Sequence, residues 1–134
     1  MDIGIKAKDI MEEGFPIIDS NATLEECMDQ LKRSEWDVCV VLNHGIIYSI
    51  LDSDDLVREY LRRGDKRVAV RNLGCSGRFA IVKADTDLFK IIEKMKEGTE
   101  YFIVKENPSI GLITKERLAE KNHLAFEARK KVVR

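Results

Sequence analysis

Apolar residues recur along the chain at intervals of three and four, and the whole arrangement occurs twice. Leu24, Cys27, Met28 and Leu31 follow the i, i+3, i+4, i+7 spacing that marks one face of an amphipathic helix. The same spacing returns 64 positions later, at Leu88, Ile91, Ile92 and Met95. A unit this short buries its own apolar face poorly, so we expect the two copies to pack on each other.

Each copy predicts five elements in the order strand, helix, strand, strand, helix. Stretches rich in β-branched residues predict the strands, and Asn43-His44-Gly45 is a turn because Asn and Gly tolerate a left-handed backbone. We expect Asn21 and Asp85 to cap the first helix of each copy. In the first copy the predicted strands are 17–18, 38–42 and 46–51, and the predicted helices are 24–31 and a segment from 52–55 to Gly64.

The second copy follows the same plan with a changing offset. Residues 38–40 are matched to 102–104 at an offset of 64, whereas 49–52 are matched to 111–114 at an offset of 62. We attribute this difference to the second hairpin turn, 106–109, which we predict to be two residues shorter than the turn of the first copy. The predicted division is therefore repeat 1 at 1–66 and repeat 2 at 67–134, with a C-terminal helical tail from Lys115 to Arg134.

Composition narrows the classes of protein. Of 134 residues, 44% are hydrophobic, which suffices for a packed core. A net charge of -1 argues against a dedicated nucleic-acid binder. The longest apolar run, Val38 to Leu42, is too short to span a membrane, and the N-terminus lacks the apolar core of a signal peptide. We therefore expect a cytoplasmic protein without membrane association.

The residues that could carry chemistry have simpler interpretations. Cys27 and Cys39 read as small core residues, and Cys75 as a loop cysteine, with a reactive thiol as the alternative. Asp52, Asp54 and Asp55 could hold a metal ion or could simply cap a helix, and capping is favoured at Asp54. His44 and His123 lack ligand spacing. Because no catalytic motif is recognisable, we do not expect an enzyme.

Three motifs occur in a specific order: Lys8-Asp9-Ile10-Met11 followed by Phe15-Pro16, then Asn21-Ala22-Thr23-Leu24-Glu25-Glu26, and finally Gly111-Leu112-Ile113-Thr114. With the duplication, they make residues from about 5 to 120 resemble a tandem pair of cystathionine β-synthase (CBS) domains, a Bateman module. The resemblance implies an α/β fold of two β-α-β-β-α repeats related by a pseudo-two-fold axis. Each repeat would hold a three-stranded sheet with two helices.

The resemblance also implies a regulatory, ligand-sensing function. Such pairs often bind AMP, ADP, ATP or S-adenosylmethionine in the cleft between the repeats, through a Gly-x-x-Thr-x-x-Asp pattern. In the first copy Asp55 fills the Asp position and Asp52 replaces the hydroxyl residue; in the second, Thr114 is present but Arg117 replaces the Asp. Because a guanidinium cannot accept hydrogen bonds from ribose, we expect at most one ribose-type site, around Asp55. Asp52 would repel a phosphate there and favour a ligand with little negative charge.

The resemblance places apolar residues of the first two strands against the base. These residues are Phe15, Pro16, Ile17 and either Trp36 or Val38 in the first copy, with Phe79 and Ile81 at the matching positions of the second. We expect no required cofactor, a homodimer formed through helices, and a separate effector protein. Two alternatives stay open: a scaffold with degenerate nucleotide sites, favoured by Asp52 and Arg117, and nucleic-acid binding through the basic linker 62–67.

Overall fold

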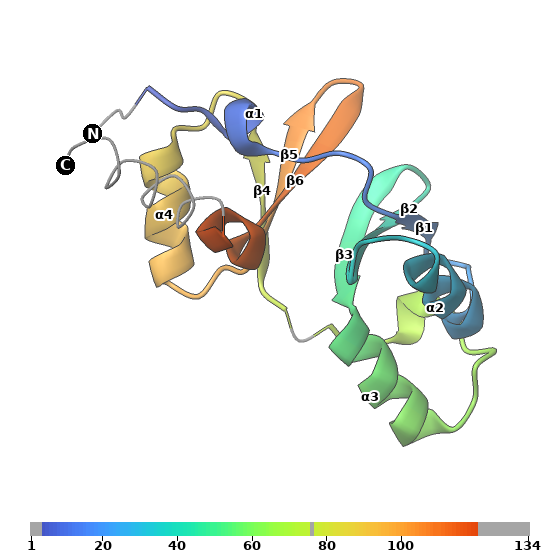
Figure 1. Cartoon of the computed structure of the whole chain (residues 1–134). Helices are drawn as coiled ribbons and strands as arrows, with labels where there is room; N and C mark the ends of the chain where they lie inside the picture. The colour runs from blue at the N-terminus through green and yellow to red at the C-terminus, as the bar shows by residue number, and fades with distance from the viewer. Residues whose placement is uncertain (1–3, 76, 121–134) are drawn as a thin grey trace. The chain divides into compact units, whose positions relative to one another are not determined.

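The computed structural model describes residues 4–75 and 77–120, which form two compact units (Figure 1). One unit comprises Gly14–Gly77, and the other combines Met1–Glu13 with Arg78–Arg134. Each unit holds one three-stranded sheet, in the order β1-β2-β3 or β4-β5-β6, so the predicted α/β class is confirmed. The compact units differ from the predicted repeats, 1–66 and 67–134, because the first residues of the chain join the second sheet.

In the Gly14–Gly77 unit, β1 pairs parallel with β2, and β2 pairs antiparallel with β3. A capping box between Asp52 and Asp55 begins helix α3, and Gly64, with a φ of 65°, ends it in the left-handed conformation that glycine adopts without strain. The elements are β1 (Ile17–Asp19), α2 (Leu24–Lys32), β2 (Val38–Asn43), β3 (Ile46–Asp52), α3 (Ser53–Arg63) and the 3-10 helix η1 (Val70–Asn72).

The core of this unit lies between one sheet face and the two helices. Cys27 and Leu31 from α2, and Leu56 from α3, pack with Ile18 and Val41 from the sheet. Burying an aliphatic side chain of this size contributes about 1.5–3 kcal/mol, so the apolar stripe of each helix holds it on the sheet. The other buried members of the cluster are Leu24, Cys39, Leu51 and Val70.

The second unit repeats this sheet. It contains α1 (Ala7–Ile10), β4 (Phe79–Lys83), α4 (Leu88–Lys96), β5 (Tyr101–Glu106) and β6 (Ser109–Thr114), followed by helical residues 115–120. Its buried core cluster consists of Ala7, Val82, Leu88, Ile91, Phe102, Val104, Ile113 and Leu118. The rest of the predicted C-terminal helix, and His123, lie outside the described residues.

Each short helix, α1 and η1, packs in the unit whose sheet is formed by the other sequence repeat. In α1, the backbone N–H of Ala7 donates to the Thr86 carbonyl at 2.7 Å. In η1, the N–H of Val70 donates to the Ala22 carbonyl at 2.8 Å. Each segment therefore completes the unit whose sheet comes from the other repeat.

Pairing corrects the predicted match between the middle strands. Val38 pairs with Asp52, and Tyr101 pairs with Thr114, so Val38 corresponds to Tyr101 at an offset of 63. The predicted offset of 64 is wrong because the connection 97–100 is one residue shorter than the connection 33–37. A shift of one residue moves every side chain of a strand to the other face.

The expected shortening of the second hairpin turn is also wrong. Residues 44–45 link Asn43 to its partner Ile46, and residues 107–108 link Glu106 to its partner Ser109, so the two turns are equally long. The offset falls again because β3 contains one additional residue, Tyr48, between the residues that pair with Val41 and Leu42. This β-bulge has no counterpart in the continuous pairing of β5 with β6.

The predicted helix caps are displaced by two residues. Thr23 caps α2, because its side-chain oxygen accepts the N–H of Glu26 at 3.1 Å. Asp87 caps α4, because its carboxylate accepts the N–H of Phe89 at 2.9 Å. Asn21 and Asp85 are therefore wrong as caps, since a cap directly precedes the first helical residue.

Candidate functional site

Four predicted site residues lie on the face of the first sheet opposite its helices. Ile17 pairs with Val40, whose other partner is Ile50, and this row alternates with the core residues Ile18 and Val41. The neighbouring row contains Val38 and Asp52, and Phe15 falls in line with it two residues before Ile17. The register thus gathers Phe15, Ile17, Val38 and Asp52 on one face.

The apolar part of this face is incompletely covered. Phe15 and Val38 are buried, whereas Ile17 leaves 45% of its surface exposed. The ring of Phe15 meets Trp36 edge to face at 5.9 Å, so Trp36 supports the wall through Phe15. Pro16 is buried, and its carbonyl accepts the N–H of Val40 at 3.1 Å.

The second sheet repeats these rows. Ile81 pairs with Ile103, whose other partner is Leu112, and Phe79 stands in the row of Tyr101 and Thr114. Ile81, like its counterpart Ile17, is about half exposed, at 48%. An exposed isoleucine at the same place in both sheets is a surface on which a flat apolar ligand group could lie.

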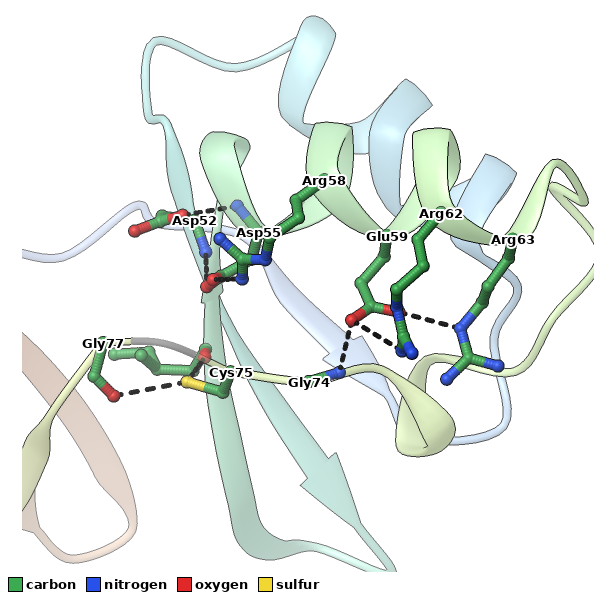
Figure 2. A network of polar contacts seen from close by, with 10 residues as sticks. Asp52, Asp55, Arg58, Glu59, Arg62, Arg63, Gly74, Cys75 and Gly77 are labelled. Carbon is green, nitrogen blue, oxygen red and sulfur yellow. Dashed lines mark hydrogen bonds and ion pairs between the residues drawn. The ribbon is translucent and has the colours of Figure 1, made fainter.

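Asp52 and Asp55 face each other across the first turn of α3 (Figure 2). Asp52 Oδ1 accepts the N–H of Asp55 at 2.8 Å, and Asp55 Oδ2 accepts the N–H of Asp52 at 3.1 Å. Asp55 is 1% exposed and also forms an ion pair with Arg58 one turn later, at 2.5 Å. Because Arg58 donates a hydrogen bond to the Asp55 carboxylate, the pKa of its guanidinium rises above the ordinary value. The predicted binding carboxylate is therefore buried and held in place by its own helix.

A second buried carboxylate attaches the following loop to α3. Glu59 accepts hydrogen bonds from Arg63 Nε at 2.8 Å, from Arg62 at 2.9 Å and from the backbone N–H of Gly74 at 3.2 Å. These donors, Arg63 first, lower the pKa of Glu59 to about 2 against the opposing effect of burial. Arg63 also donates to the carbonyl of Asn72, so the network positions residues 72–74.

This loop brings Cys75 to the Asp55 end of α3 (Figure 2). The Cys75 thiol lies 2.6 Å from the carbonyl of Ile50. Partial burial, and next the negative charge of Asp55, raise the thiol pKa. Cys75 was predicted to be an ordinary loop cysteine, and its position beside Asp55 was missed.

In the second unit, an ion pair occupies the equivalent place. Thr114 is buried, and its hydroxyl accepts the N–H of Arg117 at 3.1 Å, so the two take the cap positions of Asp52 and Asp55. The Arg117 guanidinium donates to both oxygens of Glu12, at 3.0 and 2.9 Å. Sequence reasoning missed Glu12. Both missed residues follow the matched segments 7–10 and 70–73, so extending that match would have aligned Glu12 with Cys75.

The basic stretch and the acidic cluster have local partners. Arg62 and Arg63 pair with Glu59, and Arg67 pairs with Asp65, which reduces the positive charge of the linker. Over residues 4–75 and 77–120, no three histidine, cysteine or carboxylate side chains are grouped as a metal site requires. Among these residues, too, no helix has the length and apolar character needed to cross a membrane.

Comparison with known proteins identifies the fold. Residues 7–62 match the family model of the CBS domain. Over these residues the chain is similar to a CBS domain. Its fold over most of its length is that of solved CBS-domain pairs, although no curated protein sequence matches it.

Three solved structures illustrate the similarity. The CBS-domain pair of protein MJ0100, in complex with 5'-methylthioadenosine and S-adenosyl-L-methionine, has a TM-score of 0.70 at 18% identity, with 89% of this chain and 96% of that chain covered. A Vibrio cholerae protein assigned to acetoin utilization (AcuB) has a TM-score of 0.72 at 14% identity, with 95% and 96% covered. The CBS domain of a bacterial CNNM/CorC-family Mg2+ transporter, in complex with an inhibitor, has a TM-score of 0.69 at 19% identity, with 86% and 74% covered.

Proposed function

We propose that this CBS-domain pair is a regulatory binding module, without catalysis of its own, for an adenosine derivative with little or no negative charge. The proposal rests on the buried carboxylate of Asp55 beside an incompletely covered apolar sheet face. It is supported by the CBS pair of MJ0100, which was solved with two adenosine derivatives. AMP, ADP and ATP are the more highly charged candidates.

The arrangement suits a nucleoside. A carboxylate offers about four lone-pair directions, and Asp55 already accepts from Arg58 and from the N–H of Asp52. A ribose hydroxyl is a neutral donor, and a carboxylate can accept several such donors at once. Ile17 offers the exposed apolar surface on which an adenine ring would be covered.

Charge around the site discriminates among adenosine derivatives. Asp52, Asp54 and Asp55 occupy the start of α3, and Asp55 forms an ion pair with Arg58. A phosphate bound here would lie close to three carboxylates, whereas the neutral 5'-methylthioadenosine would bring no charge to them. The sulfonium of S-adenosylmethionine would be attracted.

Isothermal titration of the full chain with 5'-methylthioadenosine, S-adenosylmethionine, AMP and ATP tests this proposal. We expect the first two to bind more tightly than ATP, and Asp55→Asn to weaken their binding at least tenfold. Asp54→Asn is the matched control, because it removes the same charge from an exposed neighbour on the same helical turn. Equal losses in both variants would contradict a direct contact with Asp55.

Cys75 provides an independent measurement. It is the exposed cysteine of the chain, whereas Cys27 and Cys39 are buried. A ligand seated at Asp55 should slow alkylation of Cys75 by iodoacetamide. Unchanged alkylation at a saturating ligand concentration would place the ligand elsewhere.

The Glu12–Arg117 pair favours a different outcome in the second unit. Its guanidinium stands where the family has a ribose-binding carboxylate, so we propose that this position takes no ribose. If no adenosine derivative gives heat in titration, the scaffold function is favoured for the whole chain. In either case we propose a separate effector protein, whose affinity must differ between two states of the module if binding is to be transmitted.

We also propose that the chain forms a homodimer through α2 and α3. A groove of about 410 Å³ between these helices is lined by apolar residues such as Met28 and Leu56, and by carboxylates and lysines together. Glu25 and Asp29 could meet Lys32 and Lys66 of a second copy, since a two-fold interface is self-complementary. Leu61, 76% exposed on α3, adds apolar surface.

Light scattering after size-exclusion chromatography tests the dimer. Val57→Asp should halve the measured mass at micromolar concentration, because Val57 lines the groove and is 51% exposed. Ile46→Asp, at the β2–β3 hairpin, is the control because Ile46 is 72% exposed but does not line the groove. A monomeric wild type, or equal dissociation of both variants, would exclude this interface.

A further inference from the structure

Two thiols face each other in the core of the Gly14–Gly77 unit. Cys27 projects from α2 and Cys39 from β2, with 3.5 Å between their sulfur atoms. Both residues are 0% exposed and belong to the same apolar cluster. Their sequence pattern indicated two separate core residues, and only the packing of α2 on the sheet brings the sulfurs together.

We propose that Cys27 and Cys39 are a redox-active pair that forms a reversible disulfide on exposure to a peroxide. A disulfide has an S–S length of about 2.05 Å, so the sulfurs must approach by about 1.5 Å. Side-chain rotation and a small shift of α2 can supply this movement. The bond would join the middle of a helix to the strand beneath it.

The oxidation balances with hydrogen peroxide as the oxidant. One thiolate attacks a peroxide oxygen, giving a sulfenic acid and releasing hydroxide, which takes the proton that this thiol has lost to become water. The second sulfur then attacks the sulfenic sulfur, and the departing hydroxide takes the second thiol's proton to form another water. Two thiols and one peroxide thus become one disulfide and two water molecules, and a dithiol reductant reverses the change.

The two thiols share a hydrogen bond in which either sulfur can donate. The contact with Cys27, and next burial, raise the pKa of the Cys39 thiol. Either sulfur can attack the peroxide, and the other then closes the bond. Because both are buried, peroxide enters only on local opening, so the reaction is slower than modification of the exposed Cys75.

Oxidation has a built-in optical reporter. Trp36, the single tryptophan of the chain, lies in the segment that the disulfide would close, and its ring packs against Phe15. Because Trp36 lies in this closed segment, a shift of β2 on oxidation should change its emission. The same shift would reach the candidate site, since Val38, next to Cys39, pairs with Asp52.

The experiment uses the full chain with Cys75→Ser, which leaves the buried pair as its two thiols. After peroxide treatment and removal of the oxidant, thiols are counted in denaturant, and peptides are mapped by mass spectrometry. We expect the count to fall from two to zero, a peptide pair joined through Cys27 and Cys39, and a changed Trp36 emission, all restored by dithiothreitol.

The control adds Cys39→Ala to the same background and should form no intramolecular link and show no reversible emission change. An unchanged count of two thiols in the Cys75→Ser chain would overturn the proposal. A loss that dithiothreitol does not restore, or a link between two chains, would overturn it as well.

Discussion

Glu59 should make the stability of the Gly14–Gly77 unit depend on pH in a defined window. Its carboxylate is nearly buried and accepts hydrogen bonds from Arg62, Arg63 and the backbone of Gly74. Glu59→Gln keeps the size of the side chain and removes its charge. The variant therefore tests the charge rather than the packing.

The size of the effect follows from these partners. Hydrogen bonds to a charged group contribute about 1.5–3 kcal/mol, whereas an exposed ion pair contributes less than about 1 kcal/mol. Arg62 is 62% exposed, so its share is small, and Arg63 and Gly74 carry most of the stabilisation. We expect Glu59→Gln to lower the free energy of unfolding by about 2 kcal/mol at neutral pH.

The direction of the pH dependence follows from the lowered pKa. Glu59 titrates at about 2 in the folded chain against an ordinary value of 4.5, so the unfolded chain takes up the proton first as the pH falls. The stabilisation is fully present above pH 4.5 and is lost between 4.5 and about 2. The difference between wild type and Glu59→Gln should shrink across this window.

Urea unfolding of both proteins, followed by circular dichroism at several pH values from 7 down to about 2.5, measures this difference. Asp65→Asn is the control because Asp65 and Arg67 form an exposed pair, for which we expect a change below about 0.5 kcal/mol. A destabilisation by Glu59→Gln that is equally large at pH 7 and pH 3 would refute the electrostatic reasoning.

Two further substitutions test local geometry through the same unfolding measurement. Gly111→Ala should lower the free energy of unfolding by about 1–3 kcal/mol, because the added Cβ would lie 2.7 Å from Met11 Cγ and 2.9 Å from Met11 Cβ. Adding Met11→Ala should recover part of this loss. No recovery would contradict the steric explanation. Thr23→Ala should cost about 1 kcal/mol by removing the cap of α2, whereas Asn21→Ala should cost less than about 0.5 kcal/mol; the reverse order would restore Asn21 as the cap.

Much of the candidate site could be predicted before any coordinates. Asp52 and Asp55 were predicted from the family pattern that the resemblance implies, and the structure places both in a capping box at the start of α3. The apolar residues were predicted from the same resemblance; Val38 pairs with Asp52, and Phe15 falls in line with that row two residues before Ile17. The motif did not contain the ion-pair partners of its charged residues, which are Arg58 for Asp55 and Glu12 for Arg117.

Local signals determined the elements of this protein. The spacing of apolar residues predicted both amphipathic helices, and Gly64 marked the end of α3, because periodicity and termination depend on neighbours within a few residues. The duplication likewise predicted two equivalent sheets, which the pairing confirms.

Only the tertiary structure decided how these elements register and exchange. The connection before β5 is one residue shorter than the connection before β2, so Val38 corresponds to Tyr101. Both strands are apolar, so the sequence alone did not distinguish this alignment from one shifted by a residue. Glu12 meets Arg117 across 105 positions, and Cys27 meets Cys39 only because α2 packs on the sheet. Such contacts depend on packing between segments that are distant along the chain, and no periodicity within one segment encodes them.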